Sequence, residues 1–417
     1  MKKNTKVALI GLGYVGLPLL LLLNKKFYTY GFDQDIKKIN LLKKNKSYIS
    51  DVLDKDLKKL KNNKFYRRND LNKINECEFI IFCLPTPLLK GKPDLSYVIK
   101  AFKDIFPFLK KNQTIIFESS VYTGATKEIF FNKLSKKFNI GNDFFLCYSP
   151  ERIDPGKSPE QSIAYTKITK LVSGYSNKCL AKIYSIYSRV FEKIYKCDTI
   201  EIAETSKLFE NIYRSVNIGL VNELKVICDK LQLNVHKIID AASSKPFGFR
   251  PFSPGPGVGG HCIPIDPLYL SWVSKKKNYE PKFIKLSVEI NKNITLWTLK
   301  KILKILKGKK KKKILVIGLS YKKDVNDLRE SPSVRIFNKL INKGFKVDYH
   351  DPYIDNYLFG KKIFKSVKIE KLSKYQCVII LTDHSNVNYK KILLNSKKII
   401  DTRGKFIKKF NKKVIHI

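Results

Sequence analysis

Three glycines near the start of the chain are spaced for binding a dinucleotide. The pattern G-x-G-x-x-G is formed by Gly11, Gly13 and Gly16, directly after an apolar stretch from Lys6 to Ile10. In this pattern the first glycine makes a tight turn, the second lets the backbone approach a pyrophosphate, and the third packs helix on strand. The N-terminus of the following helix faces the anion. The spacing predicts a dinucleotide site between a strand and a helix.

An acidic residue stands about 20 positions further along, where a dinucleotide site needs one. Asp33 ends a second expected strand from Thr29 to Phe32. Its carboxylate can hold a ribose 2′-hydroxyl and would repel a 2′-phosphate, which favours NAD over NADP. Lys38, one helical turn further, has two interpretations that stay open: it lies near the adenosine phosphates, or it is solvated.

A second candidate site surrounds Cys262. Glycines are concentrated from Gly255 to Gly260, where they would cost backbone entropy unless the chain adopts unusual dihedrals or a ligand approaches closely. Asp266 and Pro267 have the residue types of a helix N-cap and first helical position. A thiol just before a helix N-terminus is expected to have a lowered pKa and to be nucleophilic. The alternative is a buried structural cysteine, which is the interpretation we give to the other seven.

A single long helix is expected from Ala203 to about Leu231, because this stretch has no proline and only one glycine. Apolar residues cover most of its circumference, which predicts a mostly buried helix. A polar stripe occupies the remaining side, and it is either a solvated face or the wall of an aqueous cleft. The stripe consists of Glu204, Lys207, Asn211, Arg214 and Asn222.

The elements that must position these residues alternate between strands and helices at both ends of the chain. This alternation predicts an α/β fold with two Rossmann-like, doubly wound domains of parallel strands, joined by the long central helix. Further strands are expected at 79–84, 114–118, 143–148 and 168–174, and in the last third at 314–317, 346–349, 377–381 and 398–400, with a helix over 333–342.

The charge of the chain raises a different class of function. It carries 82 Lys and Arg residues against 36 Asp and Glu, a net charge of +46 over 417 residues, which could serve a nucleic acid or an anionic membrane. Only nine of the basic residues are Arg, and the lysines are scattered along the whole chain. Nucleic-acid recognition favours the bidentate fork of Arg. We therefore expect a solvated lysine surface and no nucleic-acid partner, with a basic nucleic-acid-binding protein as a distant alternative.

The eight cysteines predict a reduced compartment. They are sparse and none lies in a C-x-x-C or other metal-ligand spacing, so we expect free thiols and no metal site. The apolar stretch near the N-terminus is interrupted by glycines and by Pro18 with no small-residue cleavage site after it, so no signal peptide is expected. No run approaches the length of about 18 apolar residues that a membrane span requires. These features predict a cytoplasmic protein.

Along its whole length the chain resembles the UDP-glucose/GDP-mannose dehydrogenase family. Its members are nucleotide-sugar 6-dehydrogenases, which oxidise a primary alcohol to a carboxylate with two NAD⁺. The matching motifs occur in the family's order. Beyond the glycine pattern they are Pro85-Thr86-Pro87, Glu118 to Val121, Ser149 to Arg152, Ala203-Glu204 with Lys207 and Asn211, Gly257 to Asp266, Tyr321-Lys322, Asp327 to Ser331 and Asp401-Thr402-Arg403.

The resemblance implies a four-electron oxidation through a covalent intermediate. After the first hydride transfer, the Cys262 thiolate would trap the aldehyde as a thiohemiacetal, and a second transfer would leave a thioester for water to hydrolyse. Glu151 is implied as general base or acid, and Lys207 as a positive charge near the developing oxyanion. Asn211 is implied to donate a hydrogen bond there, and Asp266 to orient Lys207 and a water. The polar helix stripe would then be a cleft wall.

The resemblance also implies three domains and their ligands. Residues 1–200 would bind NAD, 201–300 would form a central helical dimerisation domain, and 301–417 would bind the UDP-sugar, giving a homodimer or higher homo-oligomer. The third segment lacks the glycine pattern after its first strand, so it is expected to bind the sugar nucleotide and not a second dinucleotide. Positions that match NAD contacts are Thr86, Ser120 and Arg329. Implied substrate residues are Gly257 in the glycine loop, Tyr321 near the nucleoside, and Lys322 and Arg403 as phosphate cations.

Two stretches favour one branch of the family. Glu151 is followed by Arg-Ile-Asp, where UDP-glucose enzymes have Phe-Leu and a second Glu, and Asp266 follows Ile265, where those enzymes usually have Lys. Both features look like the branch that acts on UDP-N-acetylhexosamines. We expect oxidation of UDP-N-acetylglucosamine for a surface polysaccharide, with UDP-glucose or the manno and galacto N-acetylhexosamines as alternatives. A dehydrogenase that stops at an aldehyde or ketone, and needs no nucleophile, is a further alternative.

Overall fold

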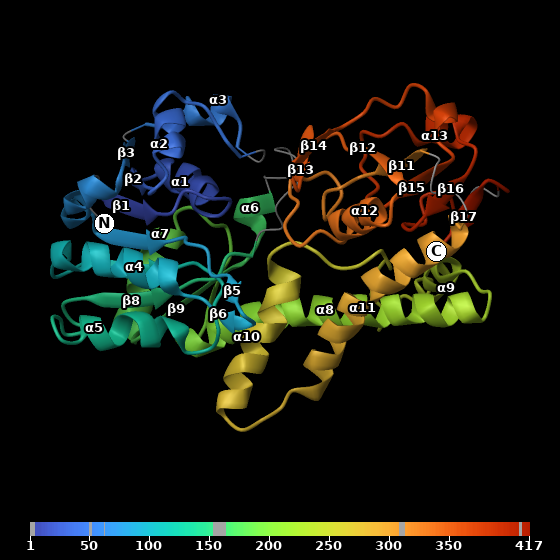
Figure 1. The fold of residues 1–417 in the computed structure, drawn as a ribbon. Helices are drawn as coiled ribbons and strands as arrows, with labels where there is room; N and C mark the ends of the chain where they lie inside the picture. Colours follow the sequence, from blue (N-terminus) through green and yellow to red (C-terminus); the bar gives the residue numbers. More distant parts are fainter. Residues whose placement is uncertain (1–4, 50–51, 62, 153–163, 308–312, 408–410) are drawn as a thin grey trace. The chain divides into compact units, whose positions relative to one another are not determined.

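In the computed structural model (Figure 1), the chain folds into two compact units. The first contains residues 1–210 and 268–279, and the second contains 211–267 and 280–417. Two of the three boundaries fall within helices, so α8 (Ile200–Lys230) and α10 (Cys262–Lys276) contribute residues to both units. The residues that the structure describes are 5–49, 52–61, 63–152, 164–307, 313–407 and 411–417.

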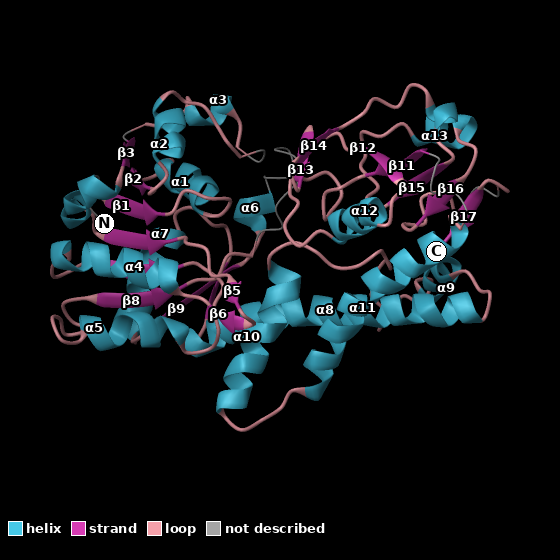
Figure 2. Cartoon of the chain, in the orientation of Figure 1, coloured by secondary structure: helices cyan, strands magenta, loops and turns pink. Residues whose placement is uncertain are grey.

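The first unit is built on an eight-stranded sheet with the order β10-β9-β8-β7-β4-β1-β2-β3. The central strands β4 and β7 are buried at every residue and apolar except at Thr114, as expected for strands covered by helices on both faces (Figure 2). The strands are β1 (Lys6–Ile10), β2 (Tyr28–Phe32), β3 (Asn63–Tyr66), β4 (Phe79–Phe82), β7 (Thr114–Phe117), β8 (Phe145–Tyr148), β9 (Lys170–Gly174) and β10 (Ile194–Lys196), and a hairpin joins β5 (Leu88–Leu89) to β6 (Lys92–Pro93). The helices are α1 (Gly16–Asn24), α2 (Ile36–Lys43), α3 (Asp54–Leu57), α4 (Ser96–Ile105), α5 (Asn132–Leu134), α6 (Ala164–Lys167) and α7 (Asn177–Tyr187).

One strand pair in this sheet contradicts the expectation of parallel strands throughout. β9 runs antiparallel to β8, with Cys147 opposite Gly174 and Tyr148 opposite Ser173. The Ser173 hydroxyl donates a hydrogen bond to the Tyr148 carbonyl across the pair, at 3.0 Å. The next strand, β10, is parallel to β9. An antiparallel edge on an otherwise parallel sheet is common in large α/β folds.

The second unit contains a five-stranded sheet in the order β12-β11-β15-β16-β17, and its strands are all parallel. Its buried apolar strands confirm the second Rossmann-like domain. The elements are α9 (Val235–Ala242), α11 (Lys282–Ile305), β11 (Lys313–Ile317), α12 (Pro332–Asn342), β12 (Lys346–His350), the hairpin of β13 (Asn356–Phe359) and β14 (Lys362–Lys365), β15 (Cys377–Ile380), α13 (Tyr389–Asn395), β16 (Ile399–Asp401) and β17 (Val414–His416).

Helix α8 is a single element over 31 residues, close to the expected bounds. The expectation that it is mostly buried is wrong for one of its sides. Five of its large apolar side chains are exposed, while four of the five members of its polar stripe are buried. The polar side is buried because the rest of the chain supplies its hydrogen-bond partners, as described below. The exposed side chains are Ile202 (45%), Phe209 (64%), Tyr213 (43%), Leu220 (61%) and Ile227 (48%).

Among the helices in the described part of the chain, none is both long and apolar enough to cross a membrane. The longest is α8, and its interior contains several charged and amide side chains.

Candidate active site

The glycine pattern forms the turn between β1 and α1. Gly11 has a φ of +94°, which a side chain would strain. A Cβ on Gly16 would lie 1.9 Å from the Gly11 carbonyl oxygen, so this position must be glycine for α1 to approach the turn. A Cβ on Gly13 would meet no protein atom within 4 Å. The turn therefore leaves open space beside Gly13 at the N-terminus of α1, and the residues fit a bound dinucleotide.

Asp33 lies directly after β2 and holds this turn. Its Oδ2 accepts a hydrogen bond from the Leu12 N–H at 3.0 Å, and its Oδ1 accepts one from the Asp35 N–H at 2.9 Å. The Lys38 ammonium lies 3.6 Å from Asp33 Oδ2, so Lys38 stands beside the predicted ribose-binding carboxylate. The structure thus brings the glycine turn, Asp33 and Lys38 together.

Two further predicted cofactor residues, Thr86 and Ser120, are also in contact. The Thr86 hydroxyl donates to the Ser120 carbonyl at 2.7 Å. The carbonyl of Thr86 in turn accepts a hydrogen bond from the Tyr269 hydroxyl on α10. Two loops at the carboxyl ends of β4 and β7 are thereby joined. Arg329 lies in the second unit, where its guanidinium pairs with Asp327 at 2.7 Å, and its predicted contact with NAD stays a prediction.

Cys262 is the first residue of α10, five positions before Pro267, the expected first residue of the helix. The prediction that Asp266 caps this helix and Pro267 begins it is wrong, because both residues lie inside it. Pro264 falls in the first turn, where no residue needs its N–H for an intrahelical bond. Pro267 lies one turn deeper and interrupts the hydrogen-bond ladder instead. The helix start still places the Cys262 thiol where a helix N-terminus faces it.

The glycine loop before Cys262 is packed tightly by the protein itself. A Cβ on Gly257, whose φ is +144°, would lie 2.1 Å from the Thr295 hydroxyl oxygen. A Cβ on Gly260 would lie 2.7 Å from the Tyr321 ring, and the Gly260 N–H donates to the Arg329 carbonyl at 2.9 Å. These glycines are needed because neighbouring elements approach the loop closely. The loop brings the predicted substrate residues Gly257 and Tyr321 into one cluster.

Asp266 lies one turn after Cys262, on the same face of α10. It is buried, with 1% exposure, and its Oδ2 accepts a hydrogen bond from the Asn211 amide at 2.6 Å. Lys207 lies one turn before Asn211 on α8 and is also buried, with 7% exposure. The structure thus links Asn211 to Asp266 directly, and the two helices add Lys207 and Cys262 at adjacent turns. Of the eight cysteines, Cys262 is the one that is half-buried; the other seven are buried.

Two other residues of the polar stripe of α8 accept hydrogen bonds from loops that pack against the helix. Glu204 is buried and accepts hydrogen bonds from the Gly124 N–H at 2.5 Å and from both the N–H and the hydroxyl of Thr126. Asn222 is buried and accepts the Gly255 N–H at 3.1 Å. The stripe is therefore not a solvated face, and Arg214 is its exposed member.

Glu151 follows β8 in the first unit, and its side chain is 13% exposed. Its Oε1 accepts a hydrogen bond from the Arg152 N–H at 2.6 Å. The Arg152 guanidinium binds Glu210 of α8 at 2.6 Å. Residues 153 and 154, used above to assign the substrate branch, lie outside the described residues.

On the substrate side of the second unit, Arg403 and Gly255 are in contact. The Arg403 Nε donates to the Leu381 carbonyl at 2.8 Å, and a Cβ on Gly255 would lie 2.7 Å from the Arg403 Nη1. The Lys225 ammonium donates to the Gly255 carbonyl at 3.3 Å. Lys322 follows Tyr321 in the turn after β11 and is half-buried. Predicted phosphate cations therefore occur at two loops of this unit.

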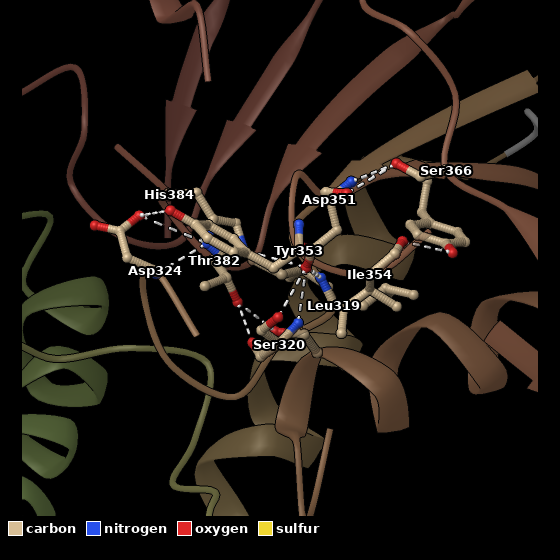
Figure 3. Close-up of polar contacts among 12 residues, drawn as sticks. Leu319, Ser320, Asp324, Asp351, Tyr353, Ile354, Ser366, Thr382 and His384 are labelled. Atoms are coloured by element: carbon tan, nitrogen blue, oxygen red, sulfur yellow. Dashed lines mark hydrogen bonds and ion pairs between the residues drawn. The ribbon is translucent and has the colours of Figure 1, made fainter. Parts of the chain in front are cut away.

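The turn after β11 is fixed by a buried acid (Figure 3). Asp351 follows β12, the place that Asp33 holds after β2 in the other unit. Its Oδ2 accepts from the Leu319 N–H at 2.8 Å, from the N–H and hydroxyl of Ser320, and from His384 Nε2 at 3.1 Å. These bonds outweigh burial and lower the Asp351 pKa to about 2.

The closed state of Asp351 supports a different ligand for this unit. Its side chain has no exposed surface, whereas that of Asp33 keeps 9% exposed. A ribose hydroxyl cannot reach a carboxylate that the protein encloses. The turn after β11 thus lacks the glycine pattern, and the acid that follows β12 is enclosed, whereas its counterpart Asp33 is partly exposed.

Sequence reasoning missed several residues that shape the site. Tyr269 and Lys225 sit within helical patterns, where nothing distinguishes them from packing residues. Glu118 directly follows the buried strand β7, and it was named only as part of a family motif, although a charged residue in that place is itself a signal. Lys170 is one of 73 lysines, and composition conceals it.

The comparisons with known proteins agree with this geometry. The chain is 33% identical over 390 residues to a UDP-N-acetyl-D-glucosamine 6-dehydrogenase of Salmonella typhi, covering 91% of this chain and 90% of that protein. It is 35% identical over 392 residues to a UDP-N-acetyl-D-mannosamine dehydrogenase of Methanococcus maripaludis, covering 91% and 86%. A solved UDP-D-ManNAc dehydrogenase of Pyrococcus horikoshii superposes with a TM-score of 0.86 at 26% identity, covering 99% and 98%.

Three family models match consecutive parts of the chain. They are described as the NAD-binding, central and UDP-binding domains of the UDP-glucose/GDP-mannose dehydrogenase family, and they match residues 5–191, 201–293 and 315–408. The first match contains the glycine turn and Asp33, and the third contains the turn held by Asp351. The chain therefore belongs to the UDP-glucose/GDP-mannose dehydrogenase family, as an enzyme that uses NAD and a UDP-sugar.

Proposed function

We propose that this enzyme oxidises the C6 alcohol of UDP-N-acetylglucosamine to the carboxylate in two steps, through a covalent intermediate on Cys262. The observation that carries the proposal is the placement of Cys262 at the start of α10, one turn from a buried Asp266 that is bonded to Asn211. When bound, NAD⁺ accepts the hydride removed in each oxidation. Gly11, Gly13, Gly16 and Asp33 would hold it, assisted by Thr86 and Ser120.

The nucleophile explains how the reaction passes the aldehyde. The Cys262 sulfur adds to the aldehyde carbon and gives a thiohemiacetal, whose carbon carries the hydrogen lost in the second oxidation. The product of that oxidation is a thioester. Water then breaks the carbon–sulfur bond, which releases the carboxylate and returns the thiol.

The polar residues around Cys262 stabilise the charge that develops. Lys207 and Asn211, one turn apart on α8, direct an ammonium and an amide to one side of that helix, where an oxyanion can be bound. Asp266 fixes the Asn211 amide through their hydrogen bond. Glu151 serves as general base for the substrate hydroxyl and for water.

The stoichiometry of NADH tests the nucleophile. Four-electron oxidation gives two NADH per UDP-sugar consumed, and a dehydrogenase without a nucleophile gives one. We expect C262S to stop at or near the aldehyde or the covalent stage and C228S, on α8, to retain two NADH per sugar. Full turnover by C262S would overturn the thioester route.

The choice of sugar rests on two short stretches and on the relatives. The residues after Glu151 and before Asp266 favour an N-acetylhexosamine, and the relatives described above act by name on the gluco and manno epimers. The test is NADH production with UDP-N-acetylglucosamine, UDP-N-acetylmannosamine, UDP-N-acetylgalactosamine and UDP-glucose. We expect the first to have the highest kcat/KM. A higher value for another sugar, or equal values for all four, would contradict this choice.

We further propose that the enzyme is a homodimer that pairs through α8. The five exposed apolar side chains of this helix are spaced by four or seven residues, so they form one stripe along it. An exposed stripe of this kind is typical of a surface that another chain covers.

A further inference from the structure

A buried ion pair beside Glu151 has no role in the reaction described above. Lys170 is the first residue of β9, and Glu118 directly follows β7. The Lys170 ammonium lies 2.6 Å from Glu118 Oε2, and the side chains are 3% and 0% exposed. The other Glu118 oxygen accepts a hydrogen bond from the Tyr187 hydroxyl on α7. A pair this deeply buried is costly to desolvate and contributes little to stability by itself.

The same ammonium also reaches Glu151 and its backbone. The Lys170 Nζ lies 3.7 Å from Glu151 Oε2 and donates a hydrogen bond to the Pro150 carbonyl at 3.2 Å. One cation therefore contacts two carboxylates and the peptide group immediately before Glu151. The rings of Tyr187 and Phe191 lie 5.6 and 5.4 Å from the ammonium and shield it from water.

The charges around Glu151 come from each element packed against it. Lys170 comes from β9, Glu118 follows β7, Tyr187 belongs to α7, and the Cys83 thiol follows β4. Arg152 is adjacent but binds Glu210 of α8 through its guanidinium. Within the described residues, Lys170 is thus a cation that pairs with the Glu151 side chain.

Two carboxylates share this cation, so they compete for it. Burial raises the pKa of Glu118 to about 7, with Lys170 opposing the rise and Glu151 adding to it. Burial alone would lower the pKa of Lys170, but the two carboxylates outweigh it and the pKa is raised. Lys170 therefore stays charged, and Glu118 can take up a proton near neutral pH.

We propose that Lys170 is a positioning residue of this dehydrogenase: from its buried pair with Glu118, it holds the Glu151 carboxylate and the peptide that carries it. The proposal rests on the proposed role of Glu151 as general base. Glu118 modulates this interaction. When ionised it competes with Glu151 for the Lys170 ammonium, and when protonated it does not.

The opposite signs of the two neighbours give the test its direction. K170M removes the ammonium that favours the ionised form of Glu151. We therefore expect the acidic limb of the pH profile of kcat to move to higher pH by about one unit or more. In E118Q the Lys170 ammonium no longer pairs with a second carboxylate and stabilises the ionised form of Glu151 more strongly. The acidic limb should then move to lower pH. K170R keeps the cation and is expected to stay close to the wild-type profile.

A matched control is available on another strand of the same sheet. Lys6 on β1 pairs with Glu76 at 2.7 Å, and K6M removes an ion pair without touching Glu151. We expect K6M to leave the kcat profile in place. If K170M does not fold, E118Q carries the test alone, because it retains Lys170 and replaces an acid with an amide of equal size.

The outcomes separate this inference from the proposed function. Full turnover by E151Q would remove Glu151 from the reaction and the positioning role with it. If E151Q is inactive while K170M and E118Q keep the wild-type profile, or move it in the same direction, the positioning role is overturned and the general base stands. Shifts in opposite directions, absent in K6M, support the inference.

Discussion

Gly13 and Gly16 are three residues apart, yet we expect an added methyl group to have opposite consequences at the two positions. In G16A the methyl meets the Gly11 carbonyl, so the turn must open and the free energy of unfolding should fall by about 2 kcal/mol or more. In G13A the methyl meets no protein atom, so stability should change by less than about 0.5 kcal/mol. The methyl instead occupies the space proposed for the pyrophosphate, and the Kd for NAD should rise about tenfold or more.

Urea unfolding and NAD titration separate the two effects. Each variant is the control for the other, because both add one methyl to the same turn. Unchanged NAD affinity in a folded G13A would show that the cofactor does not approach this glycine.

Lys225 makes a second prediction at the scale of one residue. The side chain is 3% exposed, and burial, together with the nearby Arg403 charge, lowers its pKa to about 7. An unfolded lysine keeps its ordinary value near 10.5. Between these values the unfolded chain binds a proton that the folded chain does not, so stability should rise with pH across this window.

The measurement compares wild type with K225M, because the other titrating groups then cancel. The unfolding free energy of wild type relative to K225M should increase by about 2 kcal/mol or more from pH 7 to pH 10, since one unit of pKa corresponds to about 1.4 kcal/mol. K230M, at an exposed lysine of the same helix, should show no such trend. A flat difference between wild type and K225M would mean that Lys225 is charged in the folded protein at both pH values.

The sequence alone indicated a functional residue where its residue type is unusual among the neighbouring residues. Asp33 after a strand and Cys262 after a run of glycines stand out, and the structure places both beside helix N-termini. Lys170 and Lys225 do not stand out, because a buried lysine and a solvated one are the same letter in a chain with 73 of them. What makes them different is the partner that folding brings, and those partners are distant in sequence.

At the scale of elements, Glu204 joins α8 to the loop after β7. Its carboxylate satisfies three donors from Gly124 and Thr126, and it is fully buried. In E204A these donors lose their acceptor within the protein, so we expect the unfolding free energy to fall by about 2 to 4 kcal/mol. E204Q, which keeps an acceptor, should lose less.

The control for Glu204 is Glu223 on the same helix, which is exposed. E223A should change stability by less than about 0.5 kcal/mol in the same urea titration. Equal losses in E204A and E223A would assign the effect to the helix and not to the loop.

Strand positions were predictable, whereas strand direction and short strands were not. β1 has the expected bounds, and α8 begins three residues before its expected start. Both predictions were close because apolar residues predominate in both elements. The direction of β9 depends on the path of the chain before it and not on its own residues. The hairpins β5–β6 and β13–β14 are short and exposed, so the sequence contains no buried apolar run that would predict them. The start of α10 was missed because Pro267 resembles a helix start.

At the scale of the whole molecule, the stripe on α8 predicts an oligomer that one charge can dissociate. L220K places an ammonium in the middle of an apolar stripe, and its desolvation would oppose pairing. We expect wild type to sediment as a dimer and L220K as a monomer with wild-type secondary structure.

Leu394 on α13 provides the matched control, because it is 64% exposed against 61% for Leu220. L394K should sediment as wild type does. A monomeric wild type, or dimers in L220K, would contradict pairing through α8.

The distribution of cysteines has a consequence for labelling the enzyme. Seven thiols are enclosed and Cys262 alone is partly accessible, so an alkylating reagent should add once per folded chain, at the proposed nucleophile. The mass of one adduct would then count active sites, and substrate held as a thioester would protect them. An oxidant would meet the same sulfur, so oxidation of Cys262 would block the proposed nucleophile while the two compact units remain folded.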